Sequence, residues 1–252
     1  MSAWLDPLRR ALDDAPAPPR FFFRDDDAGW GDAHLHRLLD LFARHGVAID
    51  VAVIPEALGA DLARHLRARA SAGVGLHTHG FGHVNHEPAG RKCEFGSARP
   101  AADQRRDLEA GKRRLEEALG PVLDPIFTPP WNRCTQVTVD CLARLGYRVL
   151  SRNERAAPLE MRGLGELPVS VDWLWRGKPA SRRDLGRRIA RVAGNAAPVG
   201  IMLHHAVMAD DDVDALAELL ALLANHDKAH CRPMRELAAA TGAPTGACED
   251  CD

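Results

Sequence analysis

The feature that most constrains the fold is a regular alternation of short apolar runs with longer amphipathic stretches. The apolar runs cover residues 20–24, 47–54, 74–76, 125–128, 147–151, 167–171 and 199–203. Strands that alternate with helices at this spacing favour a parallel sheet. About seven such units in 252 residues predict a closed or nearly closed α/β barrel, and a doubly wound open sheet is the alternative.

The organisation of the chain follows from the same pattern. We expect a single domain over residues 1–252, because no convincing linker interrupts the alternation. Residues 1–19 read as a short amphipathic helix and a proline-rich lead-in, and residues 242–252 as a flexible tail. Helices are expected over residues 32–45, 60–72, 100–119, 135–145, 181–193 and 211–224, with a last short helix from residue 234.

Charge and hydropathy exclude several classes of function. The formal net charge of −2 offers no basic field for nucleic acid. No run approaches the roughly 18 apolar residues of a membrane span, and the N-terminus lacks the apolar core of a signal peptide. We therefore expect a cytoplasmic protein without nucleic-acid partners, whose six cysteines are thiols. The oligomeric state is left open.

Unusual polar residues follow the predicted strands. Three aspartates occupy positions 25–27, a histidine-rich stretch follows the third strand, and "PPWNR" occupies 129–133. Asp172 and the pair His204–His205 follow later strands. Because the carboxyl ends of parallel strands share one face, we expect these side chains to converge on a site there.

The aspartates and histidines together predict a metal site. Three successive carboxylates repel one another, and a bound dication would offset that repulsion while one neighbour stays free as a base. His79 and His83 are four residues apart, a spacing that brings two imidazoles to one ion if the segment turns. Two imidazoles and a carboxylate are a zinc-type catalytic set. His77 and His86 are candidates for contacts with substrate or with the ligands.

The end of the last strand predicts a general acid. Neighbouring residues on a strand point to opposite sides, so only one of His204 and His205 is expected to face the barrel mouth. Histidine titrates near neutral pH and can donate a proton there. Asp172 can keep such an imidazole protonated. Trp173 beside it either floors a sugar-sized pocket or packs in the core.

These motifs in this order resemble the polysaccharide deacetylase family, carbohydrate esterase family four, over residues 21–208. The resemblance implies a distorted (β/α)7-type barrel with parallel strands. It also implies a metal-dependent hydrolase that removes an acetyl group from an N-acetylated sugar or saccharide precursor, with a divalent ion, Zn²⁺ first among the choices. Without an export signal, the chain is expected to be a non-exported member acting on a small-molecule or oligosaccharide substrate.

The family motifs assign roles to particular residues. Asp26 matches the catalytic base and Asp27 the metal-binding aspartate, although a register shift by one would make them Asp25 and Asp26. The remaining matches are the metal ligands His79 and His83, the groove residues Pro130 and Trp131, Asp172 as the residue that tunes the acid, and His204 as the preferred acid. Trp173 and His77 complete the expected substrate contacts.

One departure from the family leaves alternatives open. The family's third motif usually begins with an arginine that tethers the base, and Thr128 stands there in this chain. Arg24 or Arg133 could take its place. The alternatives are a non-catalytic saccharide-binding relative, and a hydrolase of another non-peptide C–N bond in a cyclic amide or ureide.

Overall fold

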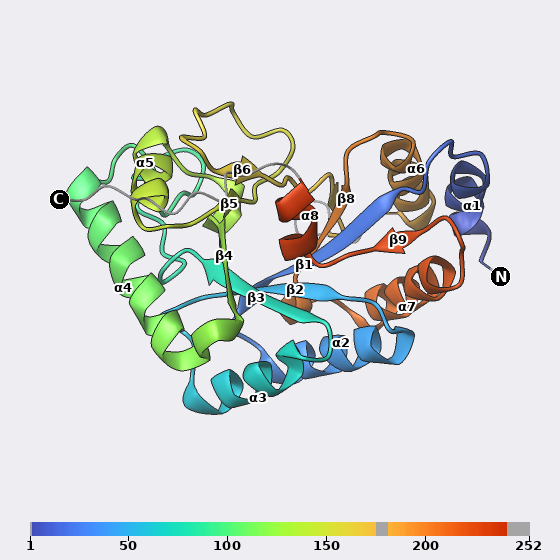
Figure 1. The fold of residues 1–252 in the computed structure, drawn as a ribbon, viewed down its shortest axis with the longest axis horizontal. Coiled ribbons are helices and arrows are strands. Elements are labelled where there is room, and N and C mark those ends of the chain that lie inside the picture. The colour runs from blue at the N-terminus through green and yellow to red at the C-terminus, as the bar shows by residue number, and fades with distance from the viewer. Residues whose placement is uncertain (1, 175–180, 241–252) are drawn as a thin grey trace.

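The computed structural model describes residues 2–174 and 181–240, and its strands form one parallel sheet (Figure 1). The order across the sheet is β6-β5-β4-β3-β2-β1-β8-β7, with β9 beside β1. The strands are β1 (Arg20–Ala28), β2 (Ile49–Val53), β3 (Val74–His79), β4 (Leu123–Thr128), β5 (Val149–Leu150), β6 (Gly165–Glu166), β7 (Val171–Asp172), β8 (Val199–Leu203) and β9 (His230–Cys231).

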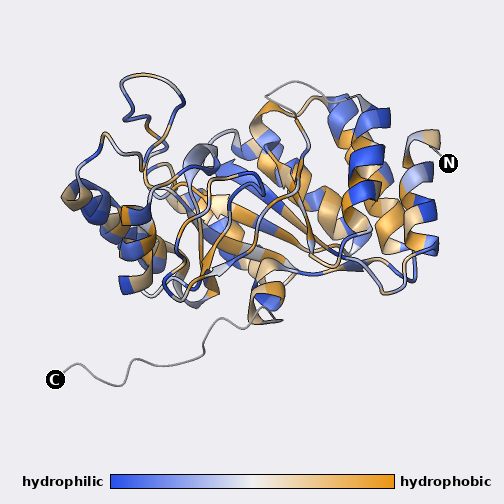
Figure 2. Cartoon of the chain, turned by 90° about the horizontal axis from the view of Figure 1, so that it is seen from above, coloured by the Kyte–Doolittle hydropathy of each residue, from blue (hydrophilic) through white to orange (hydrophobic). Residues whose placement is uncertain are grey.

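Helices surround this sheet. They are α1 (Asp6–Asp13), α2 (Asp32–His45), α3 (Ala60–Ala70), α4 (Ala101–Leu119), α5 (Gln136–Arg144), α6 (Arg182–Ala193), α7 (Asp210–Ala224) and α8 (Met234–Ala240). Apolar residues of the helices face the sheet and hydrophilic ones face outward (Figure 2), which is the arrangement that the amphipathic stretches predict. In the described part of the chain, no helix combines the length and apolar character that a membrane crossing needs.

The sheet curls into an incomplete barrel. The strands β6 and β7 stand at opposite ends of the strand order, yet only the segment 167–170 separates them in the chain. Within that segment Val169 forms an isolated bridge with Asn153, so the chain passes from one edge of the sheet towards the other. The predicted distorted (β/α)7-type barrel with parallel strands is confirmed, in preference to an open sheet.

Both faces of the sheet are covered, which explains the unbroken apolar run in β1. Phe23 packs outward against Phe42 of α2, with ring centroids 5.0 Å apart. Phe22 points into the barrel, where it joins the buried cluster of Met202 and Met234. Parallel strands buried on both faces show continuous rather than alternating hydrophobicity.

The inner face of the barrel changes from apolar to charged along β1. Phe22 is followed on the same face by Arg24 and Asp26, both buried. The helix α8 lies at the apolar end, where the backbone N–H of Met234 donates to the carboxylate of Asp50 at 2.9 Å. Polar groups therefore accumulate at the carboxyl ends of the strands, where the sequence predicts the site.

Several sequence expectations differ in detail. The strands predicted at 47–54 and 167–171 are β2 and β7 with other bounds, and the two-residue strands β6 and β9 were not predicted. So short a strand carries too few residues for a period to be read. Cys93, Cys134, Cys141 and Cys231 are free thiols, whereas the predicted tail at 242–252 lies outside the described residues.

Candidate active site

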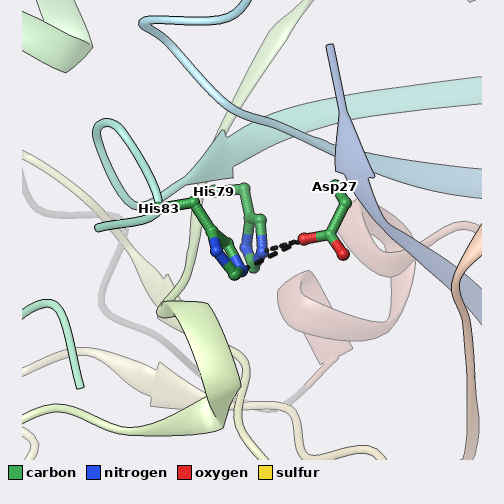
Figure 3. Close-up of side chains that lie close together, drawn as sticks. All are labelled: Asp27, His79 and His83. Atoms are coloured by element: carbon green, nitrogen blue, oxygen red, sulfur yellow. Dashed lines mark hydrogen bonds and ion pairs between the residues drawn. The ribbon is translucent and has the colours of Figure 1, made fainter. Parts of the chain in front are cut away.

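Asp27, His79 and His83 converge at the mouth of the barrel (Figure 3). The Nε2 atoms of His79 and His83 lie 3.1 and 3.2 Å from the same oxygen, Oδ1 of Asp27. The Nδ1–H of His79 donates to the carbonyl oxygen of Thr128 at 3.0 Å, which directs Nε2 towards the carboxylate of Asp27 as the atom that would bind an ion. One carboxylate and two imidazoles within 4.8 Å of one another fit a divalent transition metal with open positions.

The backbone is bent to bring these ligands together. The pairing of β1 with β2 shifts register between Asp25 and Ala28, and Asp27 adopts a left-handed φ of 71°. A bulge of this kind re-aims a side chain at a strand end. His83 also has a positive φ, of 57°. Such conformations cost of order 1–3 kcal/mol for a residue with a Cβ, and they gather at functional sites.

Glu94 holds the loop that carries the two histidines. Its buried carboxylate accepts hydrogen bonds from the backbone N–H groups of Phe81, at 3.2 Å, and Gly82, at 2.8 Å. Gly80 has a φ of +59°, and a Cβ there would lie 2.1 Å from Glu94 Oε2. The family's hydroxyl residue is therefore sterically excluded at position 80 in this chain. Glu94 was missed by the sequence analysis, because no motif includes it.

Two tryptophans pack against His83. Its ring centroid lies 4.9 Å from that of Trp30 and 4.4 Å from that of Trp131. Trp131, which also has a positive φ of 55°, lines the pocket beside the site, as predicted for a groove residue. Trp30 follows the aspartates in the sequence but was given no role, although it is 42% exposed beside His83.

Asp26 is buried and paired with Arg24 on the same face of β1. The guanidinium donates from Nε to Oδ1 at 2.8 Å and from Nη2 to Oδ2 at 2.9 Å. Burial alone would raise the pKa of Asp26, but the charges of Arg24, His79 and His204 together outweigh it and hold that pKa below its usual value. Asp26 is therefore ionised at neutral pH and free of the ligand cluster.

Arg24 binds Asp26 in this chain, which has Thr128 where the family usually has the arginine that tethers the base. Besides Asp26, its Nη1 donates to Ser151 Oγ at 2.8 Å and its Nη2 to Asn132 Oδ1 at 2.8 Å. Arg133 instead donates to the backbone of Lys92 at 2.7 Å. The arginine that reaches Asp26 thus comes from the same strand, two residues earlier.

The adjacent histidines have different environments. His204 lines the pocket together with Asp172, and it is close enough to Asp172 to oppose the rise in that carboxyl's pKa that burial causes. His205 is buried, with Nδ1 2.6 Å from Asp25 Oδ2 and Nε2 2.6 Å from the carbonyl oxygen of Trp30. Burial lowers the pKa of His205, but Asp25 outweighs this and raises it to about 9. Asp25 and His205 therefore form an internal ion pair away from the pocket.

Three residues predicted to contact substrate are buried in the structure. Trp173 is 1% exposed and stacks edge-to-face on Trp4 in the core. His77 is fully buried, where burial and the charge of Arg24 lower its pKa to about 3, and its Nε2 lies 3.0 Å from Thr128 Oγ1. Pro130 is buried beneath Gly80. His86 is exposed, outside the site. Sequence position showed that these residues follow strands, but not which way they point.

No family model matches the sequence, and no curated protein matches it. The structure is similar to that of a candidate polysaccharide deacetylase from Mycobacterium smegmatis, with a TM-score of 0.70 and 18% identity over 91% of this chain and 92% of that one. A family 4 acetyl xylan esterase from Clostridium thermocellum, in complex with a cobalt ion, has a TM-score of 0.59 and 15% identity over 89% and 93%.

A third similar structure is a CE4 family pseudoenzyme from Bacillus anthracis, with a TM-score of 0.61 and 15% identity over 88% of this chain and 66% of that one. At these identities the likeness concerns the fold. The chain has the fold of carbohydrate esterase family four, as the resemblance in its motifs implies.

Proposed function

We propose that this chain, which has the fold of carbohydrate esterase family four, is a metal-dependent hydrolase that removes an acetyl group from an N-acetylated saccharide. The observation that carries the proposal is the convergence of Asp27, His79 and His83 on one point, with Asp26 and His204 at the same end of the barrel. A cytoplasmic location stays a prediction.

Asp27, His79 and His83 would hold the ion. The set of two imidazole nitrogens and one carboxylate oxygen suits zinc, and cobalt or nickel would fit the same donors. When bound, a divalent ion supplies Lewis acidity, which acidifies water and polarises a carbonyl oxygen. Because the Thr128 carbonyl fixes the tautomer of His79, that ligand is preorganised for the ion.

Asp26 and His204 would move the protons. Asp26, kept ionised by Arg24, takes a proton from the water that attacks the acetyl carbon. His204, which lines the pocket together with Asp172, donates a proton to the leaving amine. His205 is unsuited to this role, because both of its ring nitrogens face buried protein acceptors.

Arg24 would act as a positioning residue through Asp26. Arg24→Lys keeps the positive charge but loses the two-pronged geometry that holds both oxygens of the carboxylate. We expect kcat to fall by about tenfold or more with KM little changed, together with a shift in the acidic limb of the pH–rate profile. An unchanged profile and rate would remove Arg24 from this role.

A non-catalytic saccharide-binding protein is the second candidate, because a pseudoenzyme is among the similar structures. The side chains of this site weigh against it. Asp26, the three ligands and His204 are all present, and Asp26 has an arginine partner despite the threonine at position 128.

The test combines metal content with two assays of hydrolysis, which are acetate release from acetylated sugars and C–N bond cleavage in cyclic amides and ureides. The wild type should carry stoichiometric zinc and release acetate from an N-acetyl sugar. Asp26→Asn should keep the metal and lose about 10²-fold or more in rate, as expected for a general base. Asp32→Asn, at an exposed position of α2, is the matched control and should retain full activity. An active Asp26→Asn variant, or a wild type that hydrolyses none of these compounds, would contradict the proposal.

A further inference from the structure

A pocket of about 850 Å³ extends from the candidate site, a size typical of ligand pockets. At one end it is lined by Trp131, Asp172 and His204, which belong to the candidate site. The lining as a whole carries five arginines, at positions 91, 133, 152, 155 and 188, against two carboxylates, at positions 87 and 172. The whole chain has a net charge of −2, so this excess of cations is local and does not follow from composition.

Arg91 and Arg133 line this pocket, and Lys92 lies next to them over the ring of Trp131. Arg91, Lys92 and Arg133 form no ion pair with any carboxylate in residues 2–174 and 181–240. The Nη1 of Arg133 donates to the backbone oxygen of Lys92 at 2.7 Å, and Lys92 Nζ lies 5.9 Å from the ring centroid of Trp131. Burial and the charge of Arg91 both lower the pKa of Arg133, so these like charges repel one another. We call these three residues the cationic wall.

Other arginines of the lining lie close to carboxylates. Arg155 and Arg188 lie 3.9 and 3.6 Å from the carboxylate of Glu154. Arg152 is fully paired with Glu166 at 2.5 Å and is a structural residue. Glu87, the remaining acid of the lining, accepts a hydrogen bond from the backbone N–H of Ala98 at 3.1 Å.

The position of the cationic wall relates it to the chemistry. Trp131 contacts both the metal-ligand candidate His83, with ring centroids 4.4 Å apart, and the ammonium group of Lys92. A saccharide held on Trp131 would therefore have its acetyl group near the ligands and another substituent beside the cations. Guanidinium groups bind phosphate and carboxylate oxygens through charge-assisted hydrogen bonds.

We propose that the substrate is an N-acetylated saccharide that carries an anionic group, phosphate or carboxylate, and that the cationic wall binds this group. The proposal rests on the proposed deacetylase function and narrows its substrate class. An anion on Arg91, Lys92 and Arg133 would supply a counter-charge that no carboxylate of the described residues provides through an ion pair. Neutral acetylated sugars would lack that interaction.

The experiment separates binding from turnover. Calorimetry on the zinc-loaded protein compares N-acetylglucosamine, its 1-phosphate, N-acetylmuramic acid as the carboxylate arm, and inorganic phosphate alone. We expect at least one of the two anionic sugars to bind tenfold or more tightly than N-acetylglucosamine, with an affinity that falls as salt is raised. The stronger of the two arms identifies the anionic group.

A double variant, Arg91→Gln with Lys92→Gln, assigns the effect to the cationic wall. Both residues are exposed, so the fold should be unaffected. The variant should lose most of the preference for the anionic sugar and most of the salt dependence. The matched control replaces Arg105 and Arg106, exposed on α4, with glutamine and should behave as the wild type. Both double variants keep the metal ligands, so an anion bound directly to the zinc ion would bind equally to both. A difference between the two variants would therefore come from the cationic wall.

Equal affinities for neutral and anionic sugars, or a preference that survives the double variant, would overturn the proposal. Acetate release is measured in parallel. If no sugar is hydrolysed, the deacetylase function fails, while the calorimetric comparison still decides whether the pocket selects an anionic saccharide.

Discussion

Replacing Asp50 with asparagine should stabilise the protein at alkaline pH. Asp50 is fully buried in the barrel, where burial raises its pKa to about 7. Its Oδ2 accepts the N–H of Met234, whereas its Oδ1 has no partner within the described residues. That oxygen and Oδ2 of Asp124 lie 2.0 and 3.4 Å from the point where a Cβ on Gly75 would stand. Oδ2 of Asp124 accepts no hydrogen bond within the described residues, although Nη1 of Arg235 lies 3.8 Å from it.

The direction in which stability changes with pH follows from proton linkage. The folded state holds a proton on Asp50 up to about pH 7, whereas an unfolded aspartate loses it near pH 3.8. The folded state thus binds more protons between these values, so stability falls as pH rises through this window and is level above it. Because the pKa of Asp50 rises by about 3, its ionisation lowers the free energy of unfolding by at most about 4 kcal/mol at pH 8. At pH 5 the corresponding loss is at most about 1.5 kcal/mol.

Asparagine removes that titration and keeps an acceptor for Met234. Its amide nitrogen can also donate towards Asp124. Denaturant unfolding should therefore show that Asp50→Asn is more stable than the wild type. This gain in the free energy of unfolding should be about 3 kcal/mol larger at pH 8 than at pH 5. Asp214→Asn, at an exposed position of α7, is the control and should show no such difference. A gain that is equal at both pH values, or a loss of stability, would refute the reasoning.

Three further predictions concern the site and the buried ion pair beside it. Gly80→Ala should weaken zinc binding by tenfold or more in a competition assay with a chelator, because the new Cβ meets Glu94 and the backbone has a positive φ; unchanged affinity would mean that the loop adapts freely. His205→Ala should destabilise the fold by about 3–5 kcal/mol in denaturant unfolding, because it leaves the buried Asp25 unpaired. His204→Asn should leave stability nearly unchanged and abolish most acetate release; the reverse pattern would exchange the roles of the two histidines.

The architecture was predictable from the sequence because seven apolar runs separated by helices leave few alternatives. The site was partly predictable for the same reason. Residues after parallel strands must meet at one face, so Asp27, His79 and His83 could be brought together without knowing any side-chain direction. The two-residue strands that nearly close the barrel left no readable period.

Side-chain direction accounts for what the sequence could not provide. Trp173 and His77 follow or lie in strands like the functional residues, yet both point into buried surroundings. Glu94 belongs to no motif, although it accepts a hydrogen bond from the histidine loop. Asn132 lies within "PPWNR", but nothing in that stretch indicates that its side chain accepts a hydrogen bond from Arg24. The choice of Arg24 over Arg133 likewise depended on geometry in the folded barrel.

The most direct test is a crystal structure of zinc-loaded protein with anomalous data collected at the zinc absorption edge. A single peak is expected within about 2.0–2.2 Å of Asp27 Oδ1, His79 Nε2 and His83 Nε2, with Asp26 beside it but not bound. The account would be contradicted by the absence of an anomalous peak among these three side chains, or by an ion bound elsewhere while they keep their present contacts.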